Sequence, residues 1–277
     1  MTAARDDIEF GRSSRGVPFL KGGAGEARIV VLPGVDTLFR PLDAGQRSMR
    51  RRARAIARLL PPGVWTIVGY GALDGGAGLD HVAAEAAGAI DEVVGRPNVV
   101  VGISFGGFVA QRLAAQHPKL VPRLVLLVSA HRFSEAGRNS IERQMGQLAS
   151  GDLSGLVREN ALLFRRPWLN ALTAGAIWMR GRRLTDGFRA PSDLLAAYRV
   201  FFSDDLSRNG ELLHGIAAPT LVVGGSDDQF FGAGVFRETA AMIAGARLAL
   251  FDRETHMLPL ERADAVAQEL RRFCQER

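Results

Sequence analysis

A single serine in the segment from Asn98 to Ala110 lies between a run of valines and an apolar segment that contains alanine. The valines favour a buried strand, and the apolar residues after the glycines favour a helix packed on a sheet. Between them, Gly-Ile-Ser-Phe-Gly at 102–106 makes the chain reverse within about one turn. Glycine is needed on both sides because a Cβ there would push strand and helix apart. The pattern therefore predicts a strand, a sharp turn and a helix, with Ser104 raised as a candidate nucleophile.

Short apolar runs alternate with helix-like segments over most of the chain. An edge hairpin is expected within residues 8–20, and later apolar runs predict strands at 28–32, 65–68, 98–101, 123–128, 220–225 and 247–251. Helix-like segments accompany them, at 46–60, 81–94, 104–116, 234–244 and 262–276. Strands that are apolar throughout indicate a sheet that is covered on both faces. The prediction is an α/β fold with a mostly parallel central sheet of about eight strands and helices on both faces.

Residues 131–214 break this alternation because they contain helix-like segments and no strand-like run. The pattern predicts a helical cap, or lid, after the sixth strand, which divides the fold into core residues 1–130, lid residues 131–214 and core residues 215–277. Aromatic residues collect in this insertion, among them Trp168 and Trp178. Two interpretations stay open: they pack the small core of the insertion itself, or some of them line an apolar pocket beneath it.

At 277 residues the chain is long enough to bury a full core as one large domain with an inserted lid. Its net charge is +6, but only Lys21 and Lys119 are lysines, so nearly all the positive charge is arginine. No basic segment is interleaved with aromatic residues as in proteins that bind single-stranded nucleic acids. The arginines of 46–60 fit the solvated face of an amphipathic helix. A nucleic-acid partner is therefore not expected.

The sequence contains no segment typical of export or membrane anchoring. No stretch approaches the roughly 20 apolar residues that cross a membrane, and the first ten residues carry acidic side chains and no apolar run of the kind found in secretory signals. Cys274 is the only cysteine, which excludes an intrachain disulfide. These features predict a cytoplasmic protein without stable membrane insertion.

A serine hydroxyl needs a base that takes its proton during attack, and the base is commonly a histidine oriented by a carboxylate. In a parallel sheet the loops after the strands share one edge, where ligands bind. Among the five histidines, His256 follows the last predicted strand and is the candidate base. His131 follows an earlier strand and is a candidate for the pocket lining. The loop after 220–225 offers Asp227 and Asp228 as the orienting acid, and spacing alone does not separate them.

Three segments together resemble the α/β-hydrolase fold superfamily, in its serine-nucleophile branch of esterases, lipases and thioesterases: G-I-S-F-G-G at 102–107, P-T-L-V-V-G-G-S-D-D at 219–228 and T-H-M-L-P-L-E-R at 255–262. The family order of nucleophile, acid and histidine implies Ser104, Asp228 and His256. Asp228 is favoured because the acid is usually the second member of an Asp-Asp pair. No cofactor and no metal ion are predicted.

The resemblance also implies an oxyanion hole made by the backbone N–H groups of Val35 and Phe105. The chain departs from the family pattern beside two of the inferred site residues. Pro33-Gly34 stands where the family usually has His-Gly, and Gln229 follows the acid where proline is common. Activity is still expected, because the N–H after the glycine stabilises the oxyanion.

The leading hypothesis is a serine hydrolase that cleaves a carboxylic ester or thioester of a small or medium apolar acyl substrate through an acyl-enzyme. One alternative keeps the three residues and changes the bond, as in a C–C hydrolase, a lyase, or a cyclase or thioesterase of secondary metabolism. Another is a non-catalytic ligand-binding protein with the same fold. The residues expected to line the pocket are Asp36, His131, Trp168, Trp178 and Met257.

Overall fold

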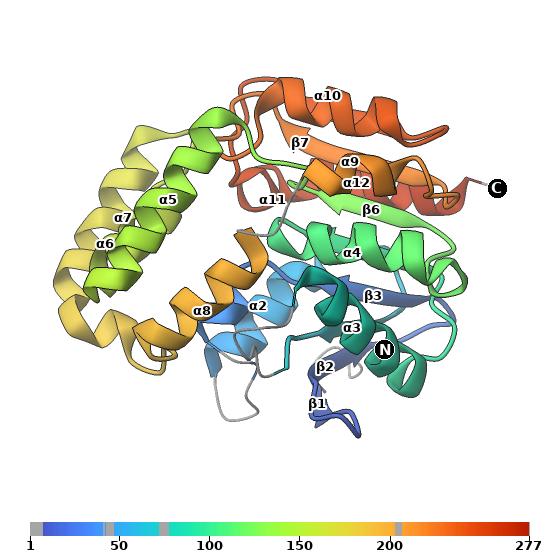
Figure 1. Ribbon diagram of the computed structural model, residues 1–277, viewed down its shortest axis with the longest axis horizontal. Coiled ribbons are helices and arrows are strands. Elements are labelled where there is room, and N and C mark those ends of the chain that lie inside the picture. Colours follow the sequence, from blue (N-terminus) through green and yellow to red (C-terminus); the bar gives the residue numbers. More distant parts are fainter. Residues whose placement is uncertain (1–7, 41, 43–46, 72–77, 203–206, 277) are drawn as a thin grey trace.

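The computed structural model describes residues 8–40, 42, 47–71, 78–202 and 207–276. The strands in this part of the chain are β1 Glu9–Arg12, β2 Pro18–Gly23, β3 Arg28–Leu32, β4 Val64–Val68, β5 Val99–Ile103, β6 Leu124–Leu127, β7 Thr220–Gly225 and β8 Arg247–Phe251. They form one sheet in the order β1-β2-β4-β3-β5-β6-β7-β8 (Figure 1). β3 to β8 are parallel, and β1 and β2 join one edge as an antiparallel hairpin. The predicted α/β fold with a mostly parallel sheet of about eight strands is confirmed.

Helices cover both faces of the sheet (Figure 1). On one face lie α3 Leu79–Val93, α4 Phe105–Gln116, α9 Ser207–Leu213 and α10 Gly232–Met242, and on the other lie α2 Arg47–Ala57 and α12 Ala263–Gln275. Alternate side chains of β5 enter the two layers, so that Val100 packs with α3 and α4 while Val99 and Val101 pack with α2 and α12. Because both faces are buried, the strands are continuous apolar runs.

The connection between β6 and β7 carries a group of helices that stands to one side of the sheet (Figure 1). These helices are α5 Glu135–Ser150, α6 Leu153–Ala161, α7 Pro167–Arg180 and α8 Pro191–Phe202. Leu148, Leu156, Leu194 and Tyr198 are buried in a small cluster of their own, together with Phe39. The helices lie in the segment predicted to form a lid, and the division of the chain into separate domains stays a prediction.

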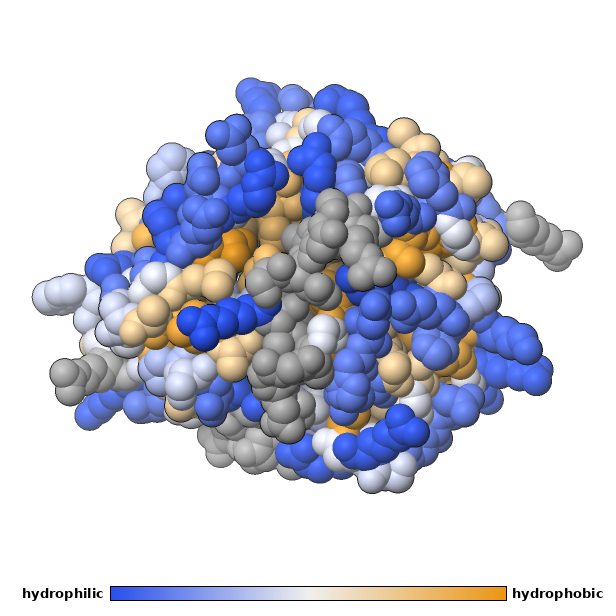
Figure 2. Space-filling view, in the orientation of Figure 1, coloured by the Kyte–Doolittle hydropathy of each residue, from blue (hydrophilic) through white to orange (hydrophobic). Residues whose placement is uncertain are grey.

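Two very short helices were not predicted, α1 Asp36–Phe39 and α11 Leu258–Glu261. Both follow strands, and a segment of four residues is too short to show a helical period. None of the helices in the described ranges has the length and apolar content that a membrane crossing needs. Residues 1–7, on which the prediction about secretion partly depends, lie outside the described residues. Hydrophilic side chains cover much of the surface seen in Figure 2, with hydrophobic ones between them.

The turn between β5 and α4 brings strand, helix and a neighbouring loop into direct backbone contact. Ser104 has φ 50° and ψ −119°, a conformation that non-glycine residues keep only where the surrounding structure enforces it. A Cβ on Gly106 would lie 2.1 Å from the carbonyl oxygen of Leu32, and a Cβ on Gly102 would lie 2.6 Å from Cα of Gly107. Glycine is required at both positions because the opposing atoms belong to the backbone and cannot move aside alone.

Gly106→Ala is therefore expected to lower the free energy of unfolding by about 3 kcal/mol, the upper end of the usual cost of overpacking. Gly146→Ala in α5 is the matched control, since nothing lies within 4 Å of its Cβ position. Alanine is the better helix former, so this control should be more stable by up to about 1 kcal/mol. Urea unfolding at neutral pH measures both changes. Equal stability of Gly106→Ala and the wild type would contradict the close approach.

Candidate active site

Three loops at the carboxyl-terminal edge of the sheet bring Ser104, Asp228 and His256 together. Ser104 follows β5, Asp228 follows β7 and His256 follows β8. Ser104 Oγ lies 2.9 Å from His256 Nε2, and His256 Nδ1 lies 2.8 Å from Asp228 Oδ2. The contacts run without a break from the hydroxyl through the imidazole to the carboxylate, which is the arrangement that a nucleophile, a base and an orienting acid need.

The Asp228 side chain is completely buried, and backbone groups fix its orientation. Its Oδ1 accepts hydrogen bonds from the N–H groups of Phe230 at 2.9 Å and Phe231 at 3.1 Å. These bonds leave Oδ2 directed at His256. Asp227 is exposed, and its carboxylate accepts a bond from the neighbouring serine hydroxyl. Of the two aspartates that spacing left open, Asp228 is the one that contacts the imidazole.

Gln229, the residue after the acid, makes a link that sequence reasoning missed. Its side-chain oxygen accepts a hydrogen bond from the His256 backbone N–H at 3.1 Å, and its amide nitrogen donates to the Leu163 carbonyl at 3.2 Å. The side chain thus joins the histidine loop to the segment between α6 and α7. The sequence did show that Gln229 stands where proline is common in the family. It could not show the role of Gln229, because the residues that it contacts are distant along the chain.

Tyr70 supports the loop that follows β3. Its hydroxyl donates to the Pro33 carbonyl at 2.6 Å, and its ring packs edge-on against Phe105 with centroids 5.3 Å apart. Burial, with a further contribution from Asp36, raises the pKa of Tyr70 well above its ordinary value, so the hydroxyl stays protonated as a donor. Tyr70 therefore contacts both elements that carry the predicted oxyanion donors, Val35 and Phe105. The shared-edge argument could have found it, because Tyr70 follows β4.

A cavity of about 400 Å³ opens beside Ser104 and His256. Most of its wall is apolar, with Phe39, Phe133 and Phe202 among the lining side chains. Asp36 and Met257, both expected to line a pocket, are also part of the wall. A cavity of this size and character is typical of a site that takes a small apolar ligand and orients it with a few polar groups.

A charged pair stands in the cavity wall. Arg52 Nη1 from α2 lies 2.5 Å from Asp36 Oδ2, and each side chain keeps somewhat less than half of its surface exposed. Because both residues line the cavity, part of that surface faces its interior. Burial raises the pKa of Asp36, while the charge of Arg52 opposes the shift. The pair thus places two charged side chains in the wall of a largely apolar cavity.

The profile of the alpha/beta hydrolase family matches residues 29–269. The chain belongs to this family. A relative from Mycobacterium tuberculosis, named as the non-heme bromoperoxidase BpoC, is 28% identical in an alignment of 225 residues that covers 74% of this chain and 79% of the relative. The 2-hydroxy-6-oxononadienedioate/2-hydroxy-6-oxononatrienedioate hydrolase of Cupriavidus pinatubonensis is 30% identical in an alignment of 188 residues that covers 64% of this chain and 62% of that protein.

Solved structures show the same fold. The enol-lactonase from Burkholderia xenovorans LB400 matches with a TM-score of 0.73 at 21% identity, covering 97% of this chain and all of that chain. The relatives are named for different reactions. Membership of the family therefore shows an enzyme of the hydrolase class and does not show which bond it cleaves.

In this alpha/beta hydrolase, the two tryptophans expected to line the pocket lie outside it. Trp168 and Trp178 of α7 are 55% and 84% exposed, and neither belongs to the cavity wall. The physical reason is that α7 packs with one side against α6 and with its end against the turn Gly181–Thr185, and the two tryptophans lie on the side that remains exposed. The abundance of aromatic residues in the insertion could not tell which face of a helix they occupy.

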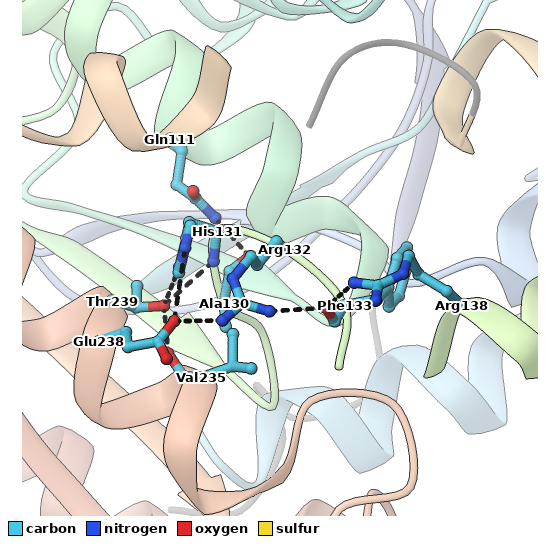
Figure 3. Close-up of polar contacts among 9 residues, drawn as sticks. All are labelled: Gln111, Ala130, His131, Arg132, Phe133, Arg138, Val235, Glu238 and Thr239. Atoms are coloured by element: carbon cyan, nitrogen blue, oxygen red, sulfur yellow. Dashed lines mark hydrogen bonds and ion pairs between the residues drawn. The ribbon is translucent and has the colours of Figure 1, made fainter. Parts of the chain in front are cut away.

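His131 also differs from its expected place, because it lies outside the cavity wall and contacts α10 (Figure 3). Its Nδ1 lies 2.8 Å from Thr239 Oγ1, and its backbone N–H donates to the same oxygen at 3.1 Å. Burial and, to a smaller extent, the charge of Arg132 lower the pKa of His131 to about 4, although Glu238, 4.0 Å from Nε2, opposes the shift. His131 is therefore a neutral core residue that ties the end of β6 to α10.

Stability should consequently depend on the protonation of His131. The unfolded chain binds this proton below about pH 6.5 and the folded protein only near pH 4, so stability present above pH 6.5 is lost as the pH falls. The loss at pH 4 should be about 3 kcal/mol. Urea unfolding of His131→Asn between pH 7 and 4 should lack this part of the pH dependence. His214→Asn, at an exposed position, should keep it; an unchanged slope in His131→Asn would show that the proton binds elsewhere.

Proposed function

We propose that this alpha/beta hydrolase cleaves a carboxylic ester or thioester of a small or medium apolar acyl substrate through an acyl-enzyme. The observation that carries the proposal is the unbroken contact from Ser104 Oγ through His256 to Asp228, beside an apolar cavity. The strained backbone at Ser104 adds support, since strain of this kind is kept where it serves a site.

Each residue of the proposed triad has one task. Ser104 Oγ attacks the carbonyl carbon while His256 Nε2 takes its proton, and Asp228 stabilises the resulting imidazolium through Nδ1. His256 then returns the proton to the leaving alcohol or thiol as the acyl-enzyme forms. Water attacks the acyl group with His256 again as the base, and His256 then returns this proton to Ser104 Oγ as the acyl–oxygen bond breaks and the acid departs.

The oxyanion formed in each step needs hydrogen-bond donors beside Ser104. We assign this role to the backbone N–H groups of Val35 and Phe105. Phe105 is the first residue of α4, where the helix carries partial positive charge, and Val35 directly precedes α1 in the loop that Tyr70 supports. The helices at residues 131–214 act in this proposal as the lid, since Tyr198 and Phe202 of α8 form part of the cavity wall.

A fluorophosphonate probe should label the wild type at Ser104 and leave Ser104→Ala unlabelled. Ser150→Ala, at the exposed end of α5, is the matched control and should be labelled as fast as the wild type. His256→Ala and Asp228→Asn should lower kcat for a p-nitrophenyl ester by about 10³-fold or more with little change in KM. A folded wild type that neither reacts with the probe nor turns over any ester or acyl thioester would be the non-catalytic ligand-binding protein instead.

A second candidate keeps the triad and cleaves a C–C bond in an acidic oxo-substrate. The observation that favours it is the Asp36–Arg52 pair in the cavity wall, because a guanidinium group there can bind a carboxylate of the substrate. The relative from Cupriavidus pinatubonensis is named for the hydrolysis of such a dicarboxylate. The two candidate functions thus differ in the charge of the substrate as well as in the bond that is cleaved.

Arg52→Gln tests whether the substrate is acidic, as the second candidate requires. If the substrate is acidic, kcat/KM for a dicarboxylate half-ester should fall about tenfold or more, the loss of one charge-assisted hydrogen bond, while that for a neutral p-nitrophenyl ester of equal length stays the same. Arg51→Gln is the control, since Arg51 is exposed on the same helix and does not line the cavity. Equal effects of Arg52→Gln on both esters would remove the support for an acidic substrate.

A further inference from the structure

Helix α7 exposes an apolar surface that no described part of the chain covers. None of its 14 residues is buried, and none is acidic. Trp168, Leu172, Trp178 and Met179 are 55%, 64%, 84% and 75% exposed. Large apolar side chains that gather in one exposed patch mark an interaction site, because apolar surface is costly to keep in water.

The exposed residues follow the helical period. At 3.6 residues per turn they occupy about a third of the circumference of α7. This set, called the α7 face below, consists of Trp168, Ala171, Leu172, Gly175, Trp178 and Met179, all of them exposed. A helix of this length draws most of its stability from packing its apolar face, so the α7 face is expected to meet a partner.

Arginines stand at both ends of the α7 face, and all are exposed: Arg165 and Arg166 before the helix, Arg180 at its end and Arg183 after it. Residues 161–185 contain no aspartate or glutamate. Two carboxylates from elsewhere approach Arg165: Glu254 lies 3.6 Å from its Nη1, and Glu261 accepts its backbone N–H. The ends of the face nevertheless keep an excess of positive charge.

A second copy of this chain is a poor partner for the α7 face. In a two-fold interface the same patch meets itself, so the arginines of one copy would face the arginines of the other in either relative direction of the helices. Like charges at close range oppose such an association. A negatively charged partner therefore fits better, and an apolar face presented by a single exposed helix suits an extended surface.

We propose that α7 docks the protein reversibly on the surface of an anionic lipid bilayer. In that position the α7 face enters the boundary between headgroups and acyl chains, and the arginines contact lipid phosphates. Tryptophans near both ends of the helix suit this boundary, where indole rings are enriched. The helix lies in the plane of the surface and does not cross the membrane.

The geometry places the beginning of α7 close to one part of the cavity wall. The backbone N–H before α7, at Arg165, donates to Glu261 Oε2 at 2.8 Å. The adjacent Leu260 is 60% exposed and also lines the cavity, so it stands where the cavity meets the surface. The beginning of α7 therefore lies beside a residue that belongs both to the cavity wall and to the surface. The proposal concerns binding alone and does not depend on the chemistry at Ser104.

Tryptophan fluorescence tests this proposal directly. The chain has three tryptophans, and the third, Trp65, is only 7% exposed, so a change on binding reports α7. Vesicles of phosphatidylcholine containing phosphatidylglycerol should shift the tryptophan emission to shorter wavelength. In a density gradient the protein should float together with these vesicles. Pure phosphatidylcholine vesicles should bind at least about tenfold more weakly, and added salt should release the protein.

Two sets of variants locate the contact. The first variant combines Trp168→Ala with Trp178→Ala. The second combines four changes: Arg165→Gln, Arg166→Gln, Arg180→Gln and Arg183→Gln. Each variant should bind vesicles about tenfold or more weakly in flotation. The control removes the same charge from exposed positions of α2 and of the residue after it, with Arg50→Gln, Arg51→Gln, Arg54→Gln and Arg58→Gln. It should stay within about threefold of the wild type. Circular dichroism and urea unfolding check that all variants remain folded.

Several results would overturn the proposal. One is the absence of flotation with phosphatidylglycerol vesicles. Another is binding that survives both sets of α7 changes or is lost in the α2 control. Sedimentation velocity gives a third: a wild-type dimer that the tryptophan variant converts to monomers would assign the α7 face to a second copy of the chain. Because vesicle binding is measured without substrate, an inactive Ser104→Ala protein should bind as the wild type does.

Discussion

The backbone contact between the start of α4 and the loop after β3 is the constraint on which the site depends. Gly106 allows the helix to approach the Leu32 carbonyl to a distance that no Cβ permits. The same contact holds Ser104 in its strained conformation and places the first N–H groups of α4 beside the loop that carries Val35. One steric requirement thus positions the proposed nucleophile and both proposed oxyanion donors, so substitution there is expected to affect more than packing.

Side chains outside the Ser104–His256–Asp228 chain hold the loops around it. Tyr70 links the loop after β3 to the start of α4, and Gln229 links the histidine loop to the helices between β6 and β7. Each such hydrogen bond contributes only about 1 kcal/mol to stability. Their effect on function is geometric, since a transition state is stabilised only by groups that are already in place.

The helices between β6 and β7 have two different apolar surfaces. Tyr198 and Phe202 of α8 face the cavity, whereas Trp168 and Trp178 of α7 face outward. The first surface is matched by apolar residues of the core, and the second has arginines at its ends and no acidic residue within the helix. The aromatic residues of this segment therefore divide among the cavity wall, the small buried cluster that contains Tyr198, and an external surface that the sequence interpretations had not considered.

The sequence by itself determined the sheet and the loops that meet at its active edge. Strands buried on both faces must be apolar throughout, and loops that follow parallel strands share one edge, so Ser104 and His256 could be paired from their places along the chain. Spacing left Asp227 and Asp228 open and only the family resemblance favoured Asp228, whose contact with the imidazole comes from the tertiary structure, as does the contact of His131 with α10. These choices depend on which face of a loop or helix meets residues far away in the chain, and local periodicity does not encode that contact.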